Sequence, residues 1–376
     1  MYYIQTLLLA GGLGFFLTRR GRISGLNVLM ISIWIVGVSI IYWRYGPIGQ
    51  WSFYQNDQYF HWRLASDLVS SEFRLSFDQF NYLRLPYTGP AHALSALGVD
   101  ATLALKFVSL MSAIATVNLV SRQLSHSNLT LSLGKFWLVA GPIISFFSLL
   151  ALRETMMVLC VSYLFLGESR RLRFVALIAL LILRPHLAAA VVFGQAWGWF
   201  FSRLQNRWYL TTVLATCILP IFIGTIGFSI GNVLLNNIPF KIEESLFLKD
   251  QVIQIFSAFA GLQFLTVAYQ TVEFTTRSIL LIRVIFPEIV IVPIAFSLSC
   301  FFITPRTTRL KLSVLSTFVF FMAVSTGTDY LSVRQTLPLM PVMGFVALLT
   351  LRKYSSAQSG ATKNSTISAA ELQQAV

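Results

Sequence analysis

The chain has very little charge for its length. Only 11% of its 376 residues are Asp, Glu, Lys or Arg, less than half of the roughly 25% found in soluble domains. Hydrophobic residues instead make up 56%, and phenylalanine alone occurs 32 times. A single core in water could not bury that much apolar surface, whereas lipid accepts it without a core. The scarcity of charge therefore argues against a soluble enzyme and predicts an integral membrane protein.

The signatures of several enzyme classes are absent as well. The sequence has no Walker-type phosphate loop, no dinucleotide-binding glycine pattern, no His-Glu-x-x-His and no Cys-x-x-Cys, so ATP-driven pumping, nicotinamide chemistry and zinc proteolysis have no support. The three cysteines, Cys160, Cys217 and Cys300, lie in apolar runs and are predicted to form neither disulfides nor a metal site. No soluble segment interleaves basic and aromatic residues, and no nucleic-acid partner is expected.

What the chain does contain is a series of apolar segments. Candidate membrane crossings, about eleven in all, fall at roughly 2–17, 25–43, 101–121, 136–151, 155–167, 174–183, 187–202, 208–230, 279–301, 312–326 and 335–351. The segments at 155–167 and 174–183 are shorter than the roughly 20 residues of a full span. They are predicted to be half-helices or re-entrant pieces that protein or a wet cavity surrounds. The fold class predicted is an all-α, polytopic helical bundle over residues 1–354.

Basic residues set the predicted orientation. Three arginines follow the first apolar segment, the reverse of a cleavable signal peptide, so the first helix is predicted to be retained. With that turn in the cytoplasm and the crossings alternating, the basic excess of the cytoplasmic turns equals the whole net charge of +14. The N-terminus is then outside, with external loops at about 44–100 and 231–277. The C-terminus is inside, with a disordered tail over 355–376.

The charged residues assigned to the cytoplasmic face are Arg19, Arg20, Arg22, Arg122, Lys135, Arg170, Arg171, Arg173, Arg203, Arg207, Arg306, Arg309, Lys311, Arg352, Lys353 and Lys363, with Glu168 and Glu371 as the only acids.

The first external loop carries an acid and a histidine one helical turn apart. A helix is predicted to begin near Asn56, with Asp57 and His61 on one face. Phe60 and Leu64 belong to an apolar stripe that is predicted to face the membrane. Held at the outer rim of the bundle, Asp57 could deprotonate a hydroxyl as a general base, with His61 assisting. The structural alternative is that Asp57 only caps the helix.

Ionisable residues also interrupt the short central segments. Arg153-Glu154 and Arg184-Pro185-His186 fall in turns that open toward the outer side in the predicted topology. Such groups are costly at membrane depth unless they are paired or wet, which makes them functional candidates. Arginine suits a phosphate, and His186 could donate to it or shuttle a proton. The alternative is an internal ion pair of Glu154 with Arg153 or Arg184 that only holds the bundle together. Asp329 and Arg334 belong to a further outer group near the last spans.

Two family resemblances follow from these residues. Asp57-Gln58-Tyr59, followed by Ala65 and Leu68, resembles the first external loop of membrane glycosyltransferases of the C-type fold. In that family an acid of this loop activates the acceptor hydroxyl, and the donor is a polyprenyl-phosphate sugar. The resemblance implies that Asp57 is the base. Gln58 stands where a second acid is common, so no metal ligand is assigned and a need for a divalent cation stays open.

The central run from Leu152-Arg153-Glu154 through Arg170-Arg171 to Leu183-Arg184-Pro185-His186 resembles polytopic polymerases of surface polysaccharides, of the O-antigen or exopolysaccharide type. In those proteins external arginines hold the diphosphate of lipid-linked repeat units. The resemblance implies that Arg153, Arg184 and Arg334 bind phosphate, with Glu154 and Asp329 in support.

Both resemblances imply sugar transfer between lipid-linked carriers at the outer face of a bacterial cytoplasmic membrane, in cell-envelope polysaccharide or glycolipid assembly. The expected partners are a polyprenyl-phosphate-linked sugar donor, a lipid-linked or glycan acceptor and the bilayer. The competing expectation is a transporter or flippase for lipids or lipid-linked oligosaccharides, in which the buried charges line a path and no covalent bond changes.

Overall fold

The computed structural model describes residues 1–21, 24–46, 55–66, 84–203, 208–220, 287–302, 305–325 and 336–352. Every regular element in these ranges is a helix. The all-α prediction is therefore confirmed for this part of the chain. The predicted loop at 231–277 and the predicted tail at 355–376 lie outside it.

Most of the helices fall on the predicted apolar segments, and α3 and α5 lie in the predicted external loop at about 44–100. In chain order they are α1 (Tyr2–Arg19), α2 (Gly25–Tyr45), α3 (Gln55–Ser66), α5 (Leu85–Ala96), α6 (Ala101–His126), α7 (Leu133–Leu138), α8 (Gly141–Ser148), α9 (Glu154–Leu166), α10 (Arg170–Leu183), α11 (Pro185–Phe201), an unlabelled helix Tyr209–Pro220, α16 (Glu288–Cys300), α17 (Pro305–Ser325) and a final helix Leu337–Arg352 that begins with the 3-10 turn η3 (Leu337–Leu339). One predicted segment, 136–151, is instead two helices, α7 and α8, because Ala140 between them takes a left-handed φ of 59°.

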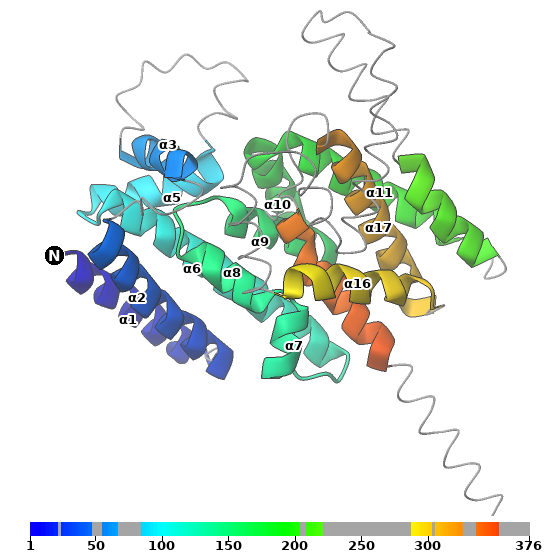
Figure 1. The fold of residues 1–376 in the computed structure, drawn as a ribbon, viewed down its shortest axis with the longest axis horizontal. Helices are drawn as coiled ribbons and strands as arrows, with labels where there is room; N and C mark the ends of the chain where they lie inside the picture. The colour runs from blue at the N-terminus through cyan, green and yellow to red at the C-terminus, as the bar shows by residue number, and fades with distance from the viewer. Residues whose placement is uncertain are drawn as a thin grey trace, which may run out of the picture.

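Two of the described helices, α2 and α6, are long and apolar enough to cross a bilayer by length and composition. Most of the apolar window of α6 is buried inside the protein, as it would also be in the core helix of a soluble fold, whereas only a third of the α2 window is buried. α1 and α2 lie side by side at one flank of the molecule, and α11 and α17 pack together toward the other (Figure 1). Trp34 joins α2 to the core by donating to the carbonyls of Lys106 and Ser148.

α6 and α9 run parallel, which gives the helix bundle two distinct ends. Ser109, in the first third of α6, donates to the carbonyl of Leu152 just before α9 at 3.1 Å. Arg122, near the end of α6, donates to Glu168 just after α9 at 3.0 Å. We call these the Arg153 end and the Glu168 end. The chain returns through α7 and α8 between the two helices, in the order that alternating crossings require.

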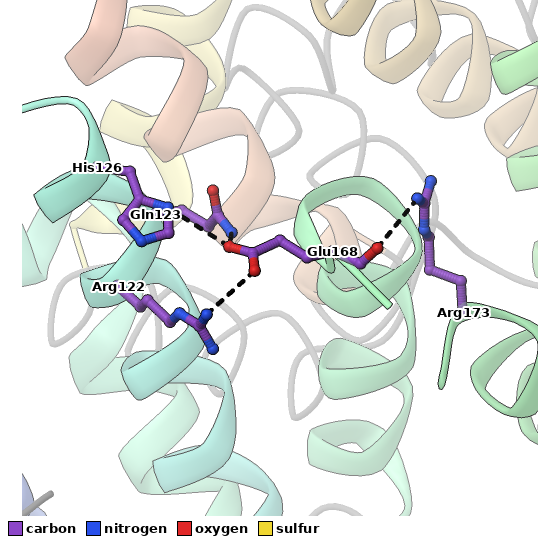
Figure 2. A network of polar contacts seen from close by, with 5 residues as sticks. All are labelled: Arg122, Gln123, His126, Glu168 and Arg173. Carbon is purple, nitrogen blue, oxygen red and sulfur yellow. Dashed lines mark hydrogen bonds and ion pairs between the residues drawn. The ribbon is translucent and has the colours of Figure 1, made fainter. Parts of the chain in front are cut away.

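The Glu168 end gathers charges that the sequence assigned to the cytoplasmic face. The Glu168 carboxylate accepts from Arg122 and Gln123 of α6, and His126 lies 3.4 Å away. Figure 2 shows Glu168 between these α6 side chains and Arg173 of α10, which donates to the Glu168 backbone carbonyl. The network lies far from the predicted site residues because α9 separates the two ends, a length of about 20 Å at the usual helical rise.

Two buried ionisable side chains secure the ends of α16. Glu288, at its N-terminus, accepts from the backbone N–H of Ile143 at 2.8 Å in the first turn of α8. Lys311 of α17 donates to the carbonyls of Ser299 and Phe302 at the other end of α16, where the last carbonyls have no partner within the helix. The sequence assigned Lys311 to the cytoplasmic face. In the structure the Lys311 side chain is buried, and it ties α17 to α16.

Candidate functional site

The candidate site begins with α3, which is fixed to the connection between α8 and α9. The backbone N–H of Ala151 donates to the Gln58 side chain at 3.1 Å, and the Ala151 carbonyl lies 3.0 Å from Nδ1 of His61. Gln58, His61 and Ala65 are all buried, and their spacing puts them on one helical face. This polar face therefore holds α3 to the protein, whereas Phe60 and Leu64 of the predicted apolar stripe are only half-buried.

Both ring nitrogens of His61 have partners. A carbonyl oxygen cannot donate, so Nδ1 carries the proton toward Ala151, and Nε2 accepts from a guanidinium nitrogen of Arg84 at 2.6 Å. Burial, together with the charges of Arg84 and Arg153, lowers the pKa of His61 well below its usual range, against weaker opposing effects of the Ala151 carbonyl and Asp57. His61 is therefore neutral near pH 7. This arrangement favours a positioning role over the proton-transfer role expected from the sequence.

Arg84 immediately precedes α5 and holds a strained backbone. Its φ is 50°, in the left-handed region that a residue with a side chain rarely adopts. Its carbonyl accepts from the N–H groups of Tyr87 and Thr88, and these bonds hold the first turn of α5 in place. Its guanidinium lies 4.7 Å from the centre of the Phe60 ring, a stacked arrangement that suits the planar cation. Arg84 is therefore held by its backbone and by two residues of α3.

A buried polar frame lies beneath these side chains. The Tyr87 hydroxyl lies 3.2 Å from the Leu105 carbonyl and 3.1 Å from Ser109 Oγ, and the Tyr87 ring meets the His61 ring edge to face. Burial raises the pKa of Tyr87 above its usual range, and the nearby charge of Glu154 adds to the effect. These hydrogen bonds join α5 to α6, and Ser109 Oγ also donates to the Leu152 carbonyl just before α9. Together they fix the position of the α8–α9 connection along α6.

Arg153 extends the site toward α10 and α11. Its guanidinium donates to the carbonyl of Leu183, the last residue of α10. That carbonyl lies at a helix end, and Pro185 begins the next helix and lacks an N–H to offer it. Arg184 separates the two helices and lies 5.1 Å from the centre of the Phe321 ring of α17. Residues 153 and 184 are therefore linked through Leu183, although they are far apart in sequence.

Three arginines share an unusual position. Arg84, Arg153 and Arg184 are the N-cap residues of α5, α9 and α11, and none of the three caps its helix through a side-chain hydrogen bond. Helix N-termini carry a partial positive charge and normally prefer Ser, Thr, Asp or Asn. Cations at these positions add to the positive potential instead of offsetting it. The described part of the site holds these three arginines together with the carboxylates of Asp57 and Glu154, so it carries charges of both signs.

The predicted site residues are placed as follows. Asp57 is half-buried in the first turn of α3, close enough to His61 for its charge to affect that histidine. Arg153 is half-buried and Glu154 is fully buried at the start of α9. His186 follows Arg184 in the first turn of α11 and is exposed. Arg334 and Asp329 lie outside the described residues. Their predicted contributions, like the catalytic roles of the others, stay predictions.

Sequence reasoning assigned no role to Arg84. The available local signal was Arg84-Leu85-Pro86, since proline is favoured at the start of a helix and marks Arg84 as the residue before α5. No group of three or more His, Cys, Asp or Glu side chains that could hold a metal ion occurs in the described ranges.

Comparison of the chain with protein families, with curated proteins and with solved structures finds no match.

Proposed function

We propose that this chain is a membrane-embedded glycosyltransferase that acts on polyprenyl-phosphate- or polyprenyl-diphosphate-linked sugars at the outer face of a bacterial cytoplasmic membrane. In this proposal the chain is a polytopic bundle of about eleven crossings with an outside N-terminus and a cytoplasmic C-terminus. Its product belongs to cell-envelope polysaccharide or glycolipid assembly.

The outward helix faces support a membrane setting. Large apolar side chains are exposed along α1, α2, α10 and α16, beyond the isolated exposed apolar residues that are normal in a soluble protein. Examples are Leu8 and Phe15 of α1 and Phe174 and Val175 of α10. Lipid would cover such faces at no cost.

The two ends of the bundle support the proposed segmentation of the chain. Arg122, Glu168 and Arg173, which were assigned to the cytoplasm, meet at the Glu168 end. Arg153 and Leu183, next to Arg184, meet at the Arg153 end. An incorrect segmentation would mix these groups between the two ends.

The short helices set the depth of the site. α9 has 13 residues, about 20 Å of helix, against a hydrocarbon core of about 30 Å. With Glu168 placed at the inner boundary of the hydrocarbon core, Arg153 lies about 10 Å below the outer boundary. Charged groups at that depth need a counter-ion or water. In this proposal a lipid phosphate enters from the side and binds at that depth.

The proposed chemistry assigns one task to each charged group. The Asp57 carboxylate takes the proton of the acceptor hydroxyl while the hydroxyl oxygen bonds to the anomeric carbon of the donor sugar. The bond between that carbon and the lipid phosphate oxygen breaks, and the phosphate leaves with the electron pair. Arg153 and Arg184 stabilise the charge that develops on it. The observation that carries the proposal is the proximity of Asp57 and Arg153, which both act on His61, combined with the bond from Arg153 to the residue before Arg184.

The test is a transfer assay with a radiolabelled polyprenyl-linked sugar and purified protein in lipid. Asp57→Asn, Arg153→Gln and Arg184→Gln should each lower product formation by roughly 100-fold or more, because each removes a group that acts mainly in the transition state. Arg63→Gln is the matched control, since Arg63 is an exposed arginine of α3. Normal transfer by Asp57→Asn would reject the mechanism. Movement of the labelled lipid across vesicles without a new glycosidic bond would establish the flippase alternative.

The orientation has a separate test. In a cysteine-free background, Tyr59→Cys on the exposed face of α3 should react with a membrane-impermeant maleimide added outside intact cells. Ser125→Cys, exposed near the Glu168 end, should react only after the cells are permeabilised. The reverse pattern would overturn the proposed topology.

A further inference from the structure

The outward face of α10 combines apolar side chains with two arginines at one end. Phe174, Val175 and Ile178 are exposed along it, and Phe174 is 64% exposed. Arg170 and Arg171, in the first turn, are exposed as well. Residues three, four and seven positions apart share a helix face, so Arg171 lies in line with all three apolar residues. This face of the helix is therefore apolar along its length and cationic at the Glu168 end.

A second surface of the same kind lies at the end of α11. Gln195, in the second half of α11, donates to the carbonyl of Leu164 near the end of α9 at 3.0 Å. α11 therefore ends at the Glu168 end of the bundle. There the guanidinium of Arg203 lies 4.0 Å from the centre of the Trp199 ring, and Trp199 and its neighbour Phe200 are both exposed.

α1 supplies a third surface. Near its start, Gln5 donates to the Gly98 carbonyl at 2.8 Å and accepts from the backbone N–H of Asp100, directly before α6. The start of α6 belongs to the Arg153 end, so the last turn of α1 lies toward the Glu168 end. In that turn the guanidinium of Arg20 lies 4.6 Å from the centre of the exposed Phe16 ring. Three helices thus present an exposed cation beside exposed apolar side chains at one end of the bundle.

These surfaces fit a ligand that is anionic at one end and apolar along its length. The acid nearest in sequence to Arg170 and Arg171, Glu168, instead lies against Arg122 and His126 of α6. A free anion would contact the arginines and leave the apolar side chains in water. A second copy of this chain would bring like charges together. An anionic phospholipid fits both features, since its phosphate meets the arginines and its acyl chains cover the apolar residues.

We propose that the outward face of α10 binds an anionic phospholipid of the cytoplasmic leaflet. Arg170 and Arg171 contact the headgroup phosphate, and Phe174 and Val175 contact the acyl chains. The arginine–aromatic pairs of α1 and α11 lie at the same headgroup level on other helices, as interfacial side chains do. This inference rests on the membrane setting and orientation of the proposed function, but not on its sugar chemistry.

The test measures lipid binding to the full-length protein in detergent micelles, with phosphatidylglycerol as the anionic probe and phosphatidylcholine of the same acyl chains as the probe without net charge. The wild-type protein should prefer phosphatidylglycerol by roughly 10- to 30-fold, the effect expected of two arginines at an anionic headgroup. The double variant Arg170→Gln, Arg171→Gln should lose most of this preference. Equal binding of the two lipids by the wild-type protein, or an unchanged preference in the double variant, would overturn the proposal.

A matched double variant controls for the loss of net charge. Arg44→Gln with Arg63→Gln removes two exposed arginines of α2 and α3. Arg44 lies away from the Glu168 end, because Tyr42 of the same turn stacks on Tyr2 at the start of α1. The preference should then change less than about threefold. A loss equal to that of the α10 variant would show a general effect of charge and reject a surface on α10.

A third variant tests the apolar half of the surface. Phe174→Ser removes acyl-chain contact but no charge, so it should weaken binding of both lipids by about 10-fold and leave the preference intact. Leu8→Ser, at a similarly exposed position of α1, should leave both affinities within about threefold of the wild-type values. Unchanged affinity in Phe174→Ser would reject the acyl contact. Inorganic phosphate that displaces phosphatidylglycerol as well as the lipid itself does would reject the lipid surface and leave a phosphate site.

The transfer assay separates this inference from the proposed function. A preference for phosphatidylglycerol that depends on Arg170 and Arg171, in a protein that transfers no sugar, would support the lipid surface and reject the glycosyltransferase. Sugar transfer by a protein without that preference would reject only the lipid surface. Failure of the purified protein to insert into vesicles would reject both.

Discussion

Gly194 of α11 lies directly against Thr317 of α17. A Cβ atom built on Gly194 would lie 1.9 Å from the Thr317 Oγ1 and 2.5 Å from the Ser313 carbonyl oxygen. Gly198, one turn later, meets the same helix, with a built Cβ 2.0 Å from Ser313 Oγ. Small residues four positions apart permit this close approach of helix backbones, as they do in many membrane proteins. The pair fixes α17, and with it Phe321, beside Arg184 at the start of α11.

Gly194→Ala should therefore destabilise the protein. The Thr317 side chain could rotate away from an added methyl group, but the Ser313 backbone carbonyl cannot, so α11 and α17 must move apart. We expect a loss of about 1–3 kcal/mol, the usual cost of overpacking, measured by thermal unfolding in detergent micelles. The control is Gly12→Ala in α1, where nothing lies within 4 Å of the added methyl group and helix propensity favours alanine. Equal melting temperatures for the two variants would contradict the close packing.

Ser109→Ala should cost more stability than Tyr87→Phe. Ser109 Oγ donates to the Leu152 carbonyl at 3.1 Å and also meets the Tyr87 hydroxyl, so its loss leaves buried polar groups unsatisfied, at about 1–3 kcal/mol. Tyr87→Phe removes one hydroxyl and should cost about 1 kcal/mol. Ser125→Ala, an exposed serine of the same helix, should change stability by less than about 0.5 kcal/mol. Denaturant midpoints would rank the three variants.

Stability should fall in mildly acidic solution because of His61. The fold disfavours its cation, so its pKa lies well below the ordinary value of 6.5. Below pH 6.5 the unfolded chain then binds more protons than the folded chain, and stability falls as the pH falls, by up to about 1.4 kcal/mol per pH unit. Above about pH 7 the contribution is complete. His61→Gln should flatten this slope in melting temperatures recorded from pH 7.5 to 5, and an unchanged slope would assign it to other groups.

The Glu168 network should add little to stability. The Arg122 and Glu168 side chains are 62% and 52% exposed, and exposed ion pairs contribute about 0–1 kcal/mol. Glu168→Gln should therefore lower stability by less than about 1 kcal/mol, and less still in 1 M salt, where the Debye length is about 3 Å. Sugar transfer should be unchanged, because the network lies at the opposite end of α9 from the candidate site. A large loss at either salt concentration would show a larger structural role for Glu168.

Much of the helix layout could be predicted from local sequence. Apolar runs and the residues that interrupt them locate α9, α10 and α11, since Arg153-Glu154 marks the start of α9 and Arg184-Pro185 the boundary between α10 and α11. The break between α7 and α8 was missed although Gly141-Pro142, a pair that often marks a turn, directly follows Ala140, which takes a left-handed conformation there. Whether each helix crosses a membrane is still a proposal.

The candidate site, like the helix layout, could be predicted only in part from local sequence. The sequence alone determined the apolar character of the chain, its helical segments and the presence of Asp57, Arg153 and Arg184 near segment ends, because composition and helical periodicity are local properties. Only the tertiary structure decided that His61 binds Ala151, 90 positions away, and thereby holds Arg84. Such a contact depends on how α3, α5 and the α8–α9 connection pack, and no local spacing encodes a hydrogen bond between segments that far apart.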